Sequence, residues 1–355
     1  HMRKTKKLRS QKAGLPPGSL VQIGELKTTS PSFNLIDYDN KGTHESTPVD
    51  ILNIAKTNPE FAIRWANFYG ALNPEALASI GSTFGLHPLV QEDILNSAQR
   101  QKIDAYEDYL YLVLHRYELQ SDSLELSQDQ ISLVIGRNFL LSFQERQSKT
   151  FEPVRQRLRA ERNALRRTGV DMLAYSLLDC VVDSYFAIVE QLNDRAEELE
   201  NQILGRPKPS ALEGIHQLKR SVSQLRRNLH PLRELLGSLY RDSDQFFTDE
   251  TRLYLRDVYD HTIHIIESLE DLRDLSTSLL DVYLSTVSHR VNLQVRTLTT
   301  IATVFMPASL IAGIFGMNFK VMPWLENTHG FFFTLMLMSC IASVMLLIIL
   351  RQKLD

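Results

Sequence analysis

The segment IAGIFGMNFK, residues 311–320, closes a long apolar run. No charged residue lies between Arg296 and Lys320, a run of about 23 residues, and Gly330 to Leu350 gives about 21 more. Each run is long enough to cross the hydrocarbon core of a bilayer. The second is apolar on every side, which is unusual in a soluble helix. We therefore predict membrane spans at 297–318 and 330–350; two buried helices of a soluble core are the alternative.

The charges beside these runs indicate how the chain lies in the membrane. The external loop predicted at 319–329 carries one basic residue, Lys320, whereas the tail at 351–355 carries Arg351 and Lys353. By the positive-inside rule both ends face the cytosol. Cys180 and Cys340 lie in unlike surroundings, so we expect no disulfide and a reducing compartment for most of the chain.

Residues 1–170 mix strand and helix patterns and predict a cytosolic α/β domain. Its basic N-terminal arm, residues 3–9, is read as a frayed terminus rather than a lipid or nucleic-acid contact. The expected strands are 61–69, 109–119 and a hairpin at 131–143, and the expected helices include 76–84 and 88–96.

Residues 171–296 form the second expected part of the cytosolic body and are helical. The motif GRPKP at 205–209 breaks this pattern, and Ser210 with Glu213 resembles a capping box for the following helix. A second break falls at 241–247, and Thr248 is a suitable start for the last helix. If that helix continues to about Phe315 it is roughly 100 Å long. Such a helix needs other helices as neighbours, and copies of itself would serve.

The motif inventory bears on the class of function. The sequence holds no P-loop, GxSxG, HExxH or CxxC motif, so an enzyme is not expected. Two crossings cannot enclose an ion pathway, so a transporter built this way must be an oligomer. A membrane-anchored coiled-coil scaffold without transport is the competing interpretation.

Three stretches carry a resemblance to a known family. FMPASLIAGIFGMNF (305–319) followed by VMP, HPLVQEDILN (87–96) and LRDVYDHTI (255–263) resemble the CorA family of magnesium transport proteins, and the likeness runs from about residue 15 onward. The resemblance implies a funnel-shaped homopentamer in the cell inner membrane that passes Mg2+ and often Co2+ or Ni2+. A zinc-transporting branch shares the GMN motif, and Trp324 stands where the family commonly has glutamate.

The resemblance also implies roles for particular residues. Gly316, Met317 and Asn318 would form the selectivity filter, since a ring of amide oxygens can accept hydrogen bonds from the water around Mg2+ without binding it too firmly. Regulatory Mg2+ would bind between neighbouring subunits, at Glu92, Asp93, Asp179 and Asp257.

Spacing alone predicts which face of the last helix lines the pathway. Steps of three and four residues select small or weakly polar side chains in the membrane part, with a hydrophobic gate at Val295 and Leu298. The expected pore-lining residues are Asn292, Val295, Leu298, Thr299, Ala302, Met306, Ser309 and Gly313. Towards the cytosol the same stripe contains no Lys or Arg, and Asp281 is its most prominent member: Ser288, Ser285, Asp281, Ser278, Asp274, Asp271, Glu267, His264, Asp260, Asp257. A neighbouring apolar stripe suits helix packing: Leu269, Leu272, Ser276, Leu279, Tyr283.

One further group of side chains lies on the same helix. Asp257, Asp260, His261 and His264 fall within about two turns, at i, i+4 spacing in two pairs. Imidazole with carboxylate suits Zn2+, Co2+ or Ni2+ better than Mg2+. The alternative is a solvated polar face.

Overall fold

The computed structural model describes residues 16, 18, 20, 31–47, 61–70, 72–97, 99–120, 123–161, 163–205, 207–242, 245–317 and 328–351. The chain divides into two compact units. The first holds the described residues of 1–201 and 209–279, and the second those of 202–208 and 280–355. The division predicted from the sequence, at residues 170 and 296, stays a prediction.

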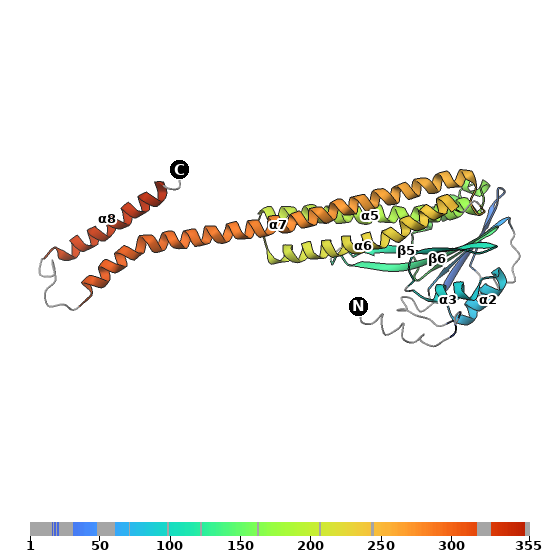
Figure 1. Ribbon diagram of the computed structural model, residues 1–355, viewed down its shortest axis with the longest axis horizontal. Coiled ribbons are helices and arrows are strands. Elements are labelled where there is room, and N and C mark those ends of the chain that lie inside the picture. Colours follow the sequence, from blue (N-terminus) through green and yellow to red (C-terminus); the bar gives the residue numbers. More distant parts are fainter. Residues whose placement is uncertain are drawn as a thin grey trace. The chain divides into compact units, whose positions relative to one another are not determined.

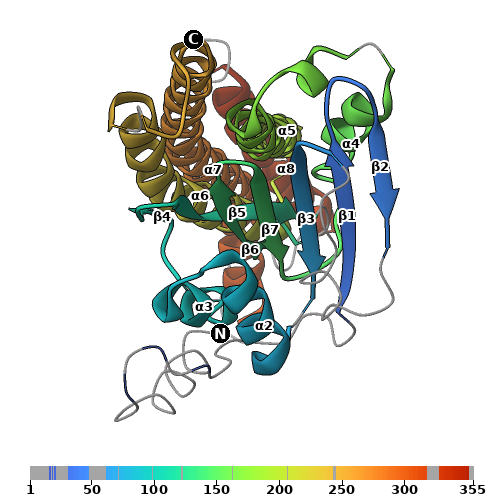
Figure 2. The ribbon, with the colours of Figure 1, turned by 90° about the vertical axis from the view of Figure 1, so that its right-hand side faces the viewer.

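The first unit is built on a seven-stranded sheet with the strand order β2-β1-β3-β7-β6-β5-β4 (Figure 2). Strands β3 and β7 pair in parallel, and every other neighbouring pair is antiparallel. Its members are β1 (Ser32–Tyr38), β2 (Thr43–Ser46), β3 (Ile63–Tyr69), β4 (Lys102–Ala105), β5 (Tyr109–Leu119), β6 (Leu126–Gly136) and β7 (Phe139–Gln144).

Both faces of this sheet are covered, which explains why its central strands read as continuous apolar runs. Helices α2 (Pro74–Phe84) and α3 (Pro88–Leu95) lie on one side, and α5 (Val170–Gly205), α6 (Pro209–Asp242) and the first part of α7 (Asp249–Phe315) lie on the other (Figures 1 and 2). Tyr111 and Val113 belong to the core under α2 and α3, while Leu112 and Leu114, which alternate with them, are equally buried.

Most elements predicted from the sequence are present. The three strand predictions correspond to β3, β5 and the β6–β7 hairpin, and the two helix predictions to α2 and α3. Strands β1, β2 and β4 and helix α4 (Glu152–Arg159) were not predicted. Two of these strands are only four residues long, too short for a periodic signal.

Helices α5, α6 and α7 pack side by side in the first unit (Figure 1). Buried residues at steps of four and three, such as Leu218, Val222 and Leu225, make the inner face of α6. The capping-box prediction is wrong: α6 begins at Pro209, so Ser210 lies inside the first turn, because proline occupies the first helical position. Both cysteines are free, as expected.

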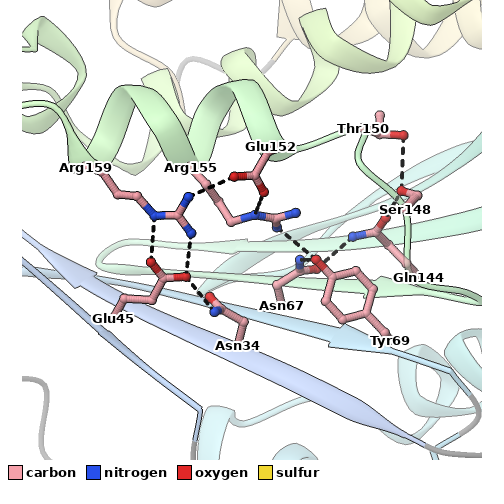
Figure 3. Close-up of polar contacts among 10 residues, drawn as sticks. All are labelled: Asn34, Glu45, Asn67, Tyr69, Gln144, Ser148, Thr150, Glu152, Arg155 and Arg159. Atoms are coloured by element: carbon pink, nitrogen blue, oxygen red, sulfur yellow. Dashed lines mark hydrogen bonds and ion pairs between the residues drawn. The ribbon is translucent and has the colours of Figure 1, made fainter.

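Helix α4 is fixed to the sheet by charged side chains rather than by apolar packing alone. Arg159 donates to both carboxylate oxygens of Glu45 on β2, at 2.8 and 2.9 Å, and Arg155 donates to the Tyr69 hydroxyl on β3 at 2.9 Å (Figure 3). Glu152 lies between the two arginines and accepts from both at 2.8 Å. The Arg159 contact holds the pKa of Glu45 below its usual value. The network ties α4 to two strands, β2 and β3, that lie far before it in the sequence.

The start of α7 is fixed by one carboxylate of α5. Asp171 Oδ2 accepts from the Thr248 backbone N–H at 3.2 Å, from the Thr248 hydroxyl at 2.8 Å and from the Thr251 hydroxyl at 2.7 Å. Thr248 also accepts from the Thr251 N–H at 3.3 Å, so the predicted helix start is confirmed. Burial alone would raise the pKa of Asp171, but these hydrogen bonds lower it below its usual value.

We predict that Asp171→Ala destabilises the protein by about 1–3 kcal/mol, because buried hydroxyls lose a charged acceptor. Since the pKa of folded Asp171 is depressed, its contribution is present above the pKa of the unfolded chain and is lost as pH falls through the folded pKa. Thermal unfolding followed by circular dichroism at neutral pH and near pH 4 measures both effects. Asp249→Ala, at an exposed carboxylate of the same helix start, is the control. An equal loss in both variants would contradict the account.

Candidate functional site

The last helices of the chain expose long apolar surfaces. The second unit contains the end of α7, up to Phe315, and α8 (Gly330–Arg351). Both are long and apolar enough to cross a membrane, and none of the most apolar window of either is buried in the single chain. The predicted helical spans are therefore present as helices. Water does not favour such surfaces, whereas lipid or further copies of the chain would cover them.

Helix α5 also passes the length and composition test for a membrane span. More than half of its most apolar window is buried, however, because α5 packs against the sheet with residues such as Leu177, Val181 and Tyr185. Its apolar character is accounted for by the core of the first unit.

The predicted filter begins where α7 ends. The Gly316 N–H donates to the Ala312 carbonyl at 2.9 Å, and the Met317 N–H donates to the Ile314 carbonyl at 3.2 Å, so the last turn tightens to a three-residue step. A Cβ on Gly316 would lie 3.1 Å from the Ala312 oxygen, which explains glycine at this close approach. Met317 is exposed. Asn318, like Trp324, lies outside the described residues.

The predicted pore-lining residues of the membrane part are all exposed in the single chain. The Thr299 hydroxyl donates to the Val295 carbonyl of its own helix at 2.8 Å. The lone pairs of the hydroxyl oxygen stay free to accept hydrogen bonds from water. An added Cβ at Gly313 would meet no atom within 4 Å beyond the backbone of its own turn. The stripe is thus open to solvent, lipid or other subunits.

The part of α7 that precedes the apolar span, residues 257–288, separates into two faces. In the first unit Leu269, Leu272, Ser276 and Leu279 are buried, which confirms that the apolar stripe packs. Every member of the acidic stripe is exposed, including Asp281 in the second unit. The packing face of this section is therefore as predicted, and the role of the acidic stripe stays a prediction.

Two of the predicted regulatory carboxylates lie on α3. Glu92 Oε2 accepts from the Gly18 N–H at 2.5 Å. Asp93 pairs with Lys102 Nζ of β4 at 2.8 Å and also accepts from the Gln99 amide. Burial alone would lower the pKa of Lys102, but hydrogen bonds to Asp104 and Asp93 raise it above its usual value. Glu92, Asp93 and Lys102 line an open pocket of about 670 Å³.

The other two predicted regulatory carboxylates lie on the opposite side of the sheet, Asp179 on α5 and Asp257 on α7 (Figure 2). Burial raises the pKa of Asp179, and the charges of Asp183 and Asp257 act in the same direction. One chain therefore presents the predicted set in two parts, on the two sides of the sheet.

The predicted group of Asp257, Asp260, His261 and His264 does not come together as a four-residue set. Asp260 Oδ2 lies 4.0 Å from Arg256 Nε, and the imidazole of His264 packs against the ring of Phe186. His261 instead lies with Asp179 and Asp183 of α5, with one ligand atom from each within 4.8 Å of the others.

Sequence reasoning missed Asp183 and Lys102. Asp183 follows Asp179 by four residues on one helix, so the spacing was available as a signal. Lys102 belongs to a strand that the sequence did not reveal.

These features define a membrane protein with two exposed helices apolar and long enough to cross a bilayer, the first of which is followed in the sequence by Gly316, Met317 and Asn318. The CorA-like Mg2+ transporter protein family matches residues 62–352. The chain therefore belongs to this family, whose members are membrane transporters of divalent cations and not enzymes.

Individual relatives agree with this assignment. The chain is 40% identical over 344 residues to the cobalt/magnesium transport protein CorA of Thermotoga maritima, covering 97% of this chain and 98% of that protein. Its fold matches the complete structure of the CorA magnesium transporter from Methanocaldococcus jannaschii, with a TM-score of 0.74, 22% identity, and 90% and 97% coverage. It is 23% identical to the zinc transport protein ZntB of Photorhabdus laumondii, over 83% of this chain and 87% of that one.

We predict that Met336→Arg in α8 lowers membrane insertion, because arginine inside an apolar span costs about 2.5–3.5 kcal/mol. Leu253→Arg in α7 is the matched control: the two side chains are 72% and 68% exposed, but Leu253 belongs to the first unit, outside the apolar spans. The fraction of chain retained in carbonate-washed membranes should fall severalfold for the first variant only. Equal retention of both would show that α8 does not lie in lipid.

Proposed function

We propose that this chain assembles as a homopentamer that passes hydrated Mg2+, and also Co2+ and often Ni2+, into the cytosol down the electrochemical gradient. The observation that carries the proposal is the Gly316-Met317 end of an exposed apolar helix in a full-length relative of CorA. The sequence contains no nucleotide motif, so the membrane potential would drive entry, worth about 2.3 kcal/mol per charge per 100 mV. The assembly would lie in the cell inner membrane with both termini in the cytosol.

Asn318 is the proposed filter residue. Five amide oxygens in a ring would accept hydrogen bonds from the water shell of the cation, without the full charge that would hold it too firmly. Mg2+ keeps an octahedral shell and sheds water reluctantly, so recognition of the hydrated ion suits it. Gly316 supports this arrangement, because its small size permits the tightened last turn described above.

The remaining pathway would follow the exposed stripe of α7. Small residues such as Ala302, Ser309 and Gly313 would let five helices approach one axis, and Val295 with Leu298 would form a hydrophobic gate. Further along, Asp281 and the exposed acidic stripe would concentrate cations at the inner mouth. The buried apolar stripe beside it supports this register, since it packs inside the chain and leaves the acidic stripe exposed.

Regulation would come from Mg2+ bound between subunits. The two halves of the carboxylate set, on α3 and on α5 with α7, lie on opposite sides of one sheet, which suits a site completed by a neighbouring chain. Carboxylates of two chains repel until a divalent cation lies between them, so abundant cytosolic Mg2+ would favour the closed state.

Zinc transport is the second candidate. The relationship to ZntB favours it, and the GMN motif of this chain does not distinguish Zn2+ from Mg2+. A membrane-anchored scaffold without transport is set aside by membership of the transporter family.

We predict that Asn318→Ala abolishes most Mg2+ uptake into liposomes while the oligomer still forms. Asn327→Ala, an amide in the predicted external loop, is the control and should keep normal flux. Parallel assays with Mg2+, Co2+, Ni2+ and Zn2+ decide between the two candidate functions. Normal Mg2+ flux through an intact Asn318→Ala oligomer would refute the filter.

We also predict that Lys102→Gln makes the protein more sensitive to Mg2+. Removing the cation 2.8 Å from Asp93 should lower the Mg2+ concentration for half-protection against chymotrypsin about three- to tenfold. Asp93→Asn should raise it. Lys41→Gln, at an exposed lysine of the β1–β2 turn, removes the same charge elsewhere and should have no effect. If Lys102→Gln behaves like wild type, Asp93 does not hold regulatory Mg2+.

A further inference from the structure

We propose that Gln101 couples the regulatory carboxylate of α3 to α6, because it holds the start of β4 against the point of α6 that a proline weakens. The inference rests on the proposed binding of Mg2+ at Asp93 and adds the residue that passes the response on. Gln101 acts through other residues, so it is a positioning residue and not a ligand. It precedes β4, the edge strand of the sheet, which has α3 on one side and α6 on the other (Figure 2).

The side chain of Gln101 bridges β5 and α6. The residue is only 5% exposed. Its Nε2 donates to the Asn228 carbonyl of α6 at 2.5 Å, and its Oε1 accepts from the His115 backbone N–H of β5 at 3.4 Å. Both ends of a buried amide are therefore used, one on the helix and one on the sheet. Losing either partner would leave a buried polar group unpaired, so the side chain fixes the distance between the two elements.

The helix is weakest where Gln101 reaches it. Pro231 lies inside α6. Proline has no N–H, so the carbonyl of Arg227, four residues earlier, lacks its usual helical donor, and the proline ring crowds that carbonyl. Asn228, whose carbonyl Gln101 bonds, is the next residue. Proline and a side chain that bonds into the helical ladder are both causes of helix bending, so Gln101 is placed where the bend of α6 changes most easily.

The segment 99–102 is held at its other side by Asp93 of α3. Lys102 Nζ lies 2.8 Å from Asp93 Oδ2, and the Gln99 amide donates to Asp93 Oδ1. Mg2+ bound to Asp93 would compete with the Lys102 ammonium and the Gln99 amide, because all three use the lone pairs of one carboxylate. Binding therefore favours an arrangement of this segment that differs from the one without Mg2+. Gln101 belongs to the segment and moves with it.

Helix α6 is in turn joined to α7 beside the same point. Arg226, two residues before Asn228, has its Nε 3.3 Å from Glu270 Oε1 of α7. Leu229 of α6 and Leu269 of α7 are both buried. Close-packed faces change between discrete arrangements and do not deform gradually, so a new bend in α6 would repack its contact with α7. Helix α7 is the one that continues into the apolar span.

Hydrogen–deuterium exchange of the full-length protein in detergent, read by mass spectrometry, tests both ends of this coupling. In wild type, Mg2+ should alter exchange in peptides of α3 and in peptides of α6 around Pro231, with one midpoint concentration. Gln101→Met keeps the length of the side chain and removes the amide. Without Mg2+ it should raise exchange in the α6 peptides about three- to tenfold, because a hydrogen bond to the helix is lost. On addition of Mg2+, α3 should respond as in wild type and α6 should not.

Gln245→Met is the matched control. The Gln245 amide donates to the Glu107 carbonyl at 3.3 Å, so the same substitution removes a bond from a side chain to the backbone at an exposed place. It should leave both responses unchanged. A wild-type response of α6 in Gln101→Met would overturn the inference, and so would loss of the response in both helices, which would make Gln101 part of the Mg2+ site itself. A wild-type α3 that does not respond to Mg2+ would refute the proposed regulation at Asp93, and this inference with it.

Discussion

The structure depends on α7, a single helix whose first part packs inside a protein core and whose last part exposes apolar side chains in the single chain. Up to Leu279, α7 buries an apolar stripe inside its own chain, and each leucine removed from water contributes about 1.5–3 kcal/mol. Beyond that section many of its apolar side chains are exposed in the single chain, including Leu298, Met306 and Leu310. The last third of the helix must be covered by lipid or by other subunits, so a membrane environment follows from the helix itself.

The first unit holds the beginning of that helix firmly. Asp171 accepts three hydrogen bonds from Thr248 and Thr251, and the α5–α6–α7 bundle packs on a sheet whose other face is covered by α2 and α3. A rigid body attached to a continuous helix suits a device in which a cation bound to the body changes the state of the helix. In one chain the carboxylates on α3 and those on α5 and α7 are kept apart, which leaves each set available to a neighbour.

Much of this could be read from the sequence, and the failures have physical causes. Charge-free runs identified α7 and α8, and apolar residues repeating at helical spacing identified the packed face of α7, because a covered helix face needs apolar residues at regular intervals. The four-residue strands β2 and β4 leave no such trace, and with them the pairing of Lys102 with Asp93 was missed. Asp183 of α5 comes close to His261 of α7 only through packing of the two helices, so the order of residues along α7 could not indicate this neighbour. The role of Asn318 stays a prediction, because that residue lies outside the described part of the chain.

Native mass spectrometry of the detergent-solubilised protein tests the central claim most directly, since an ion pathway requires several copies of α7 around one axis. The account predicts a single main species of five chains, each of 40.7 kDa, with no sizeable population of free chains. A stable monomer or dimer that still transported Mg2+ in liposomes would contradict it, because one or two copies of two crossings cannot enclose a pathway.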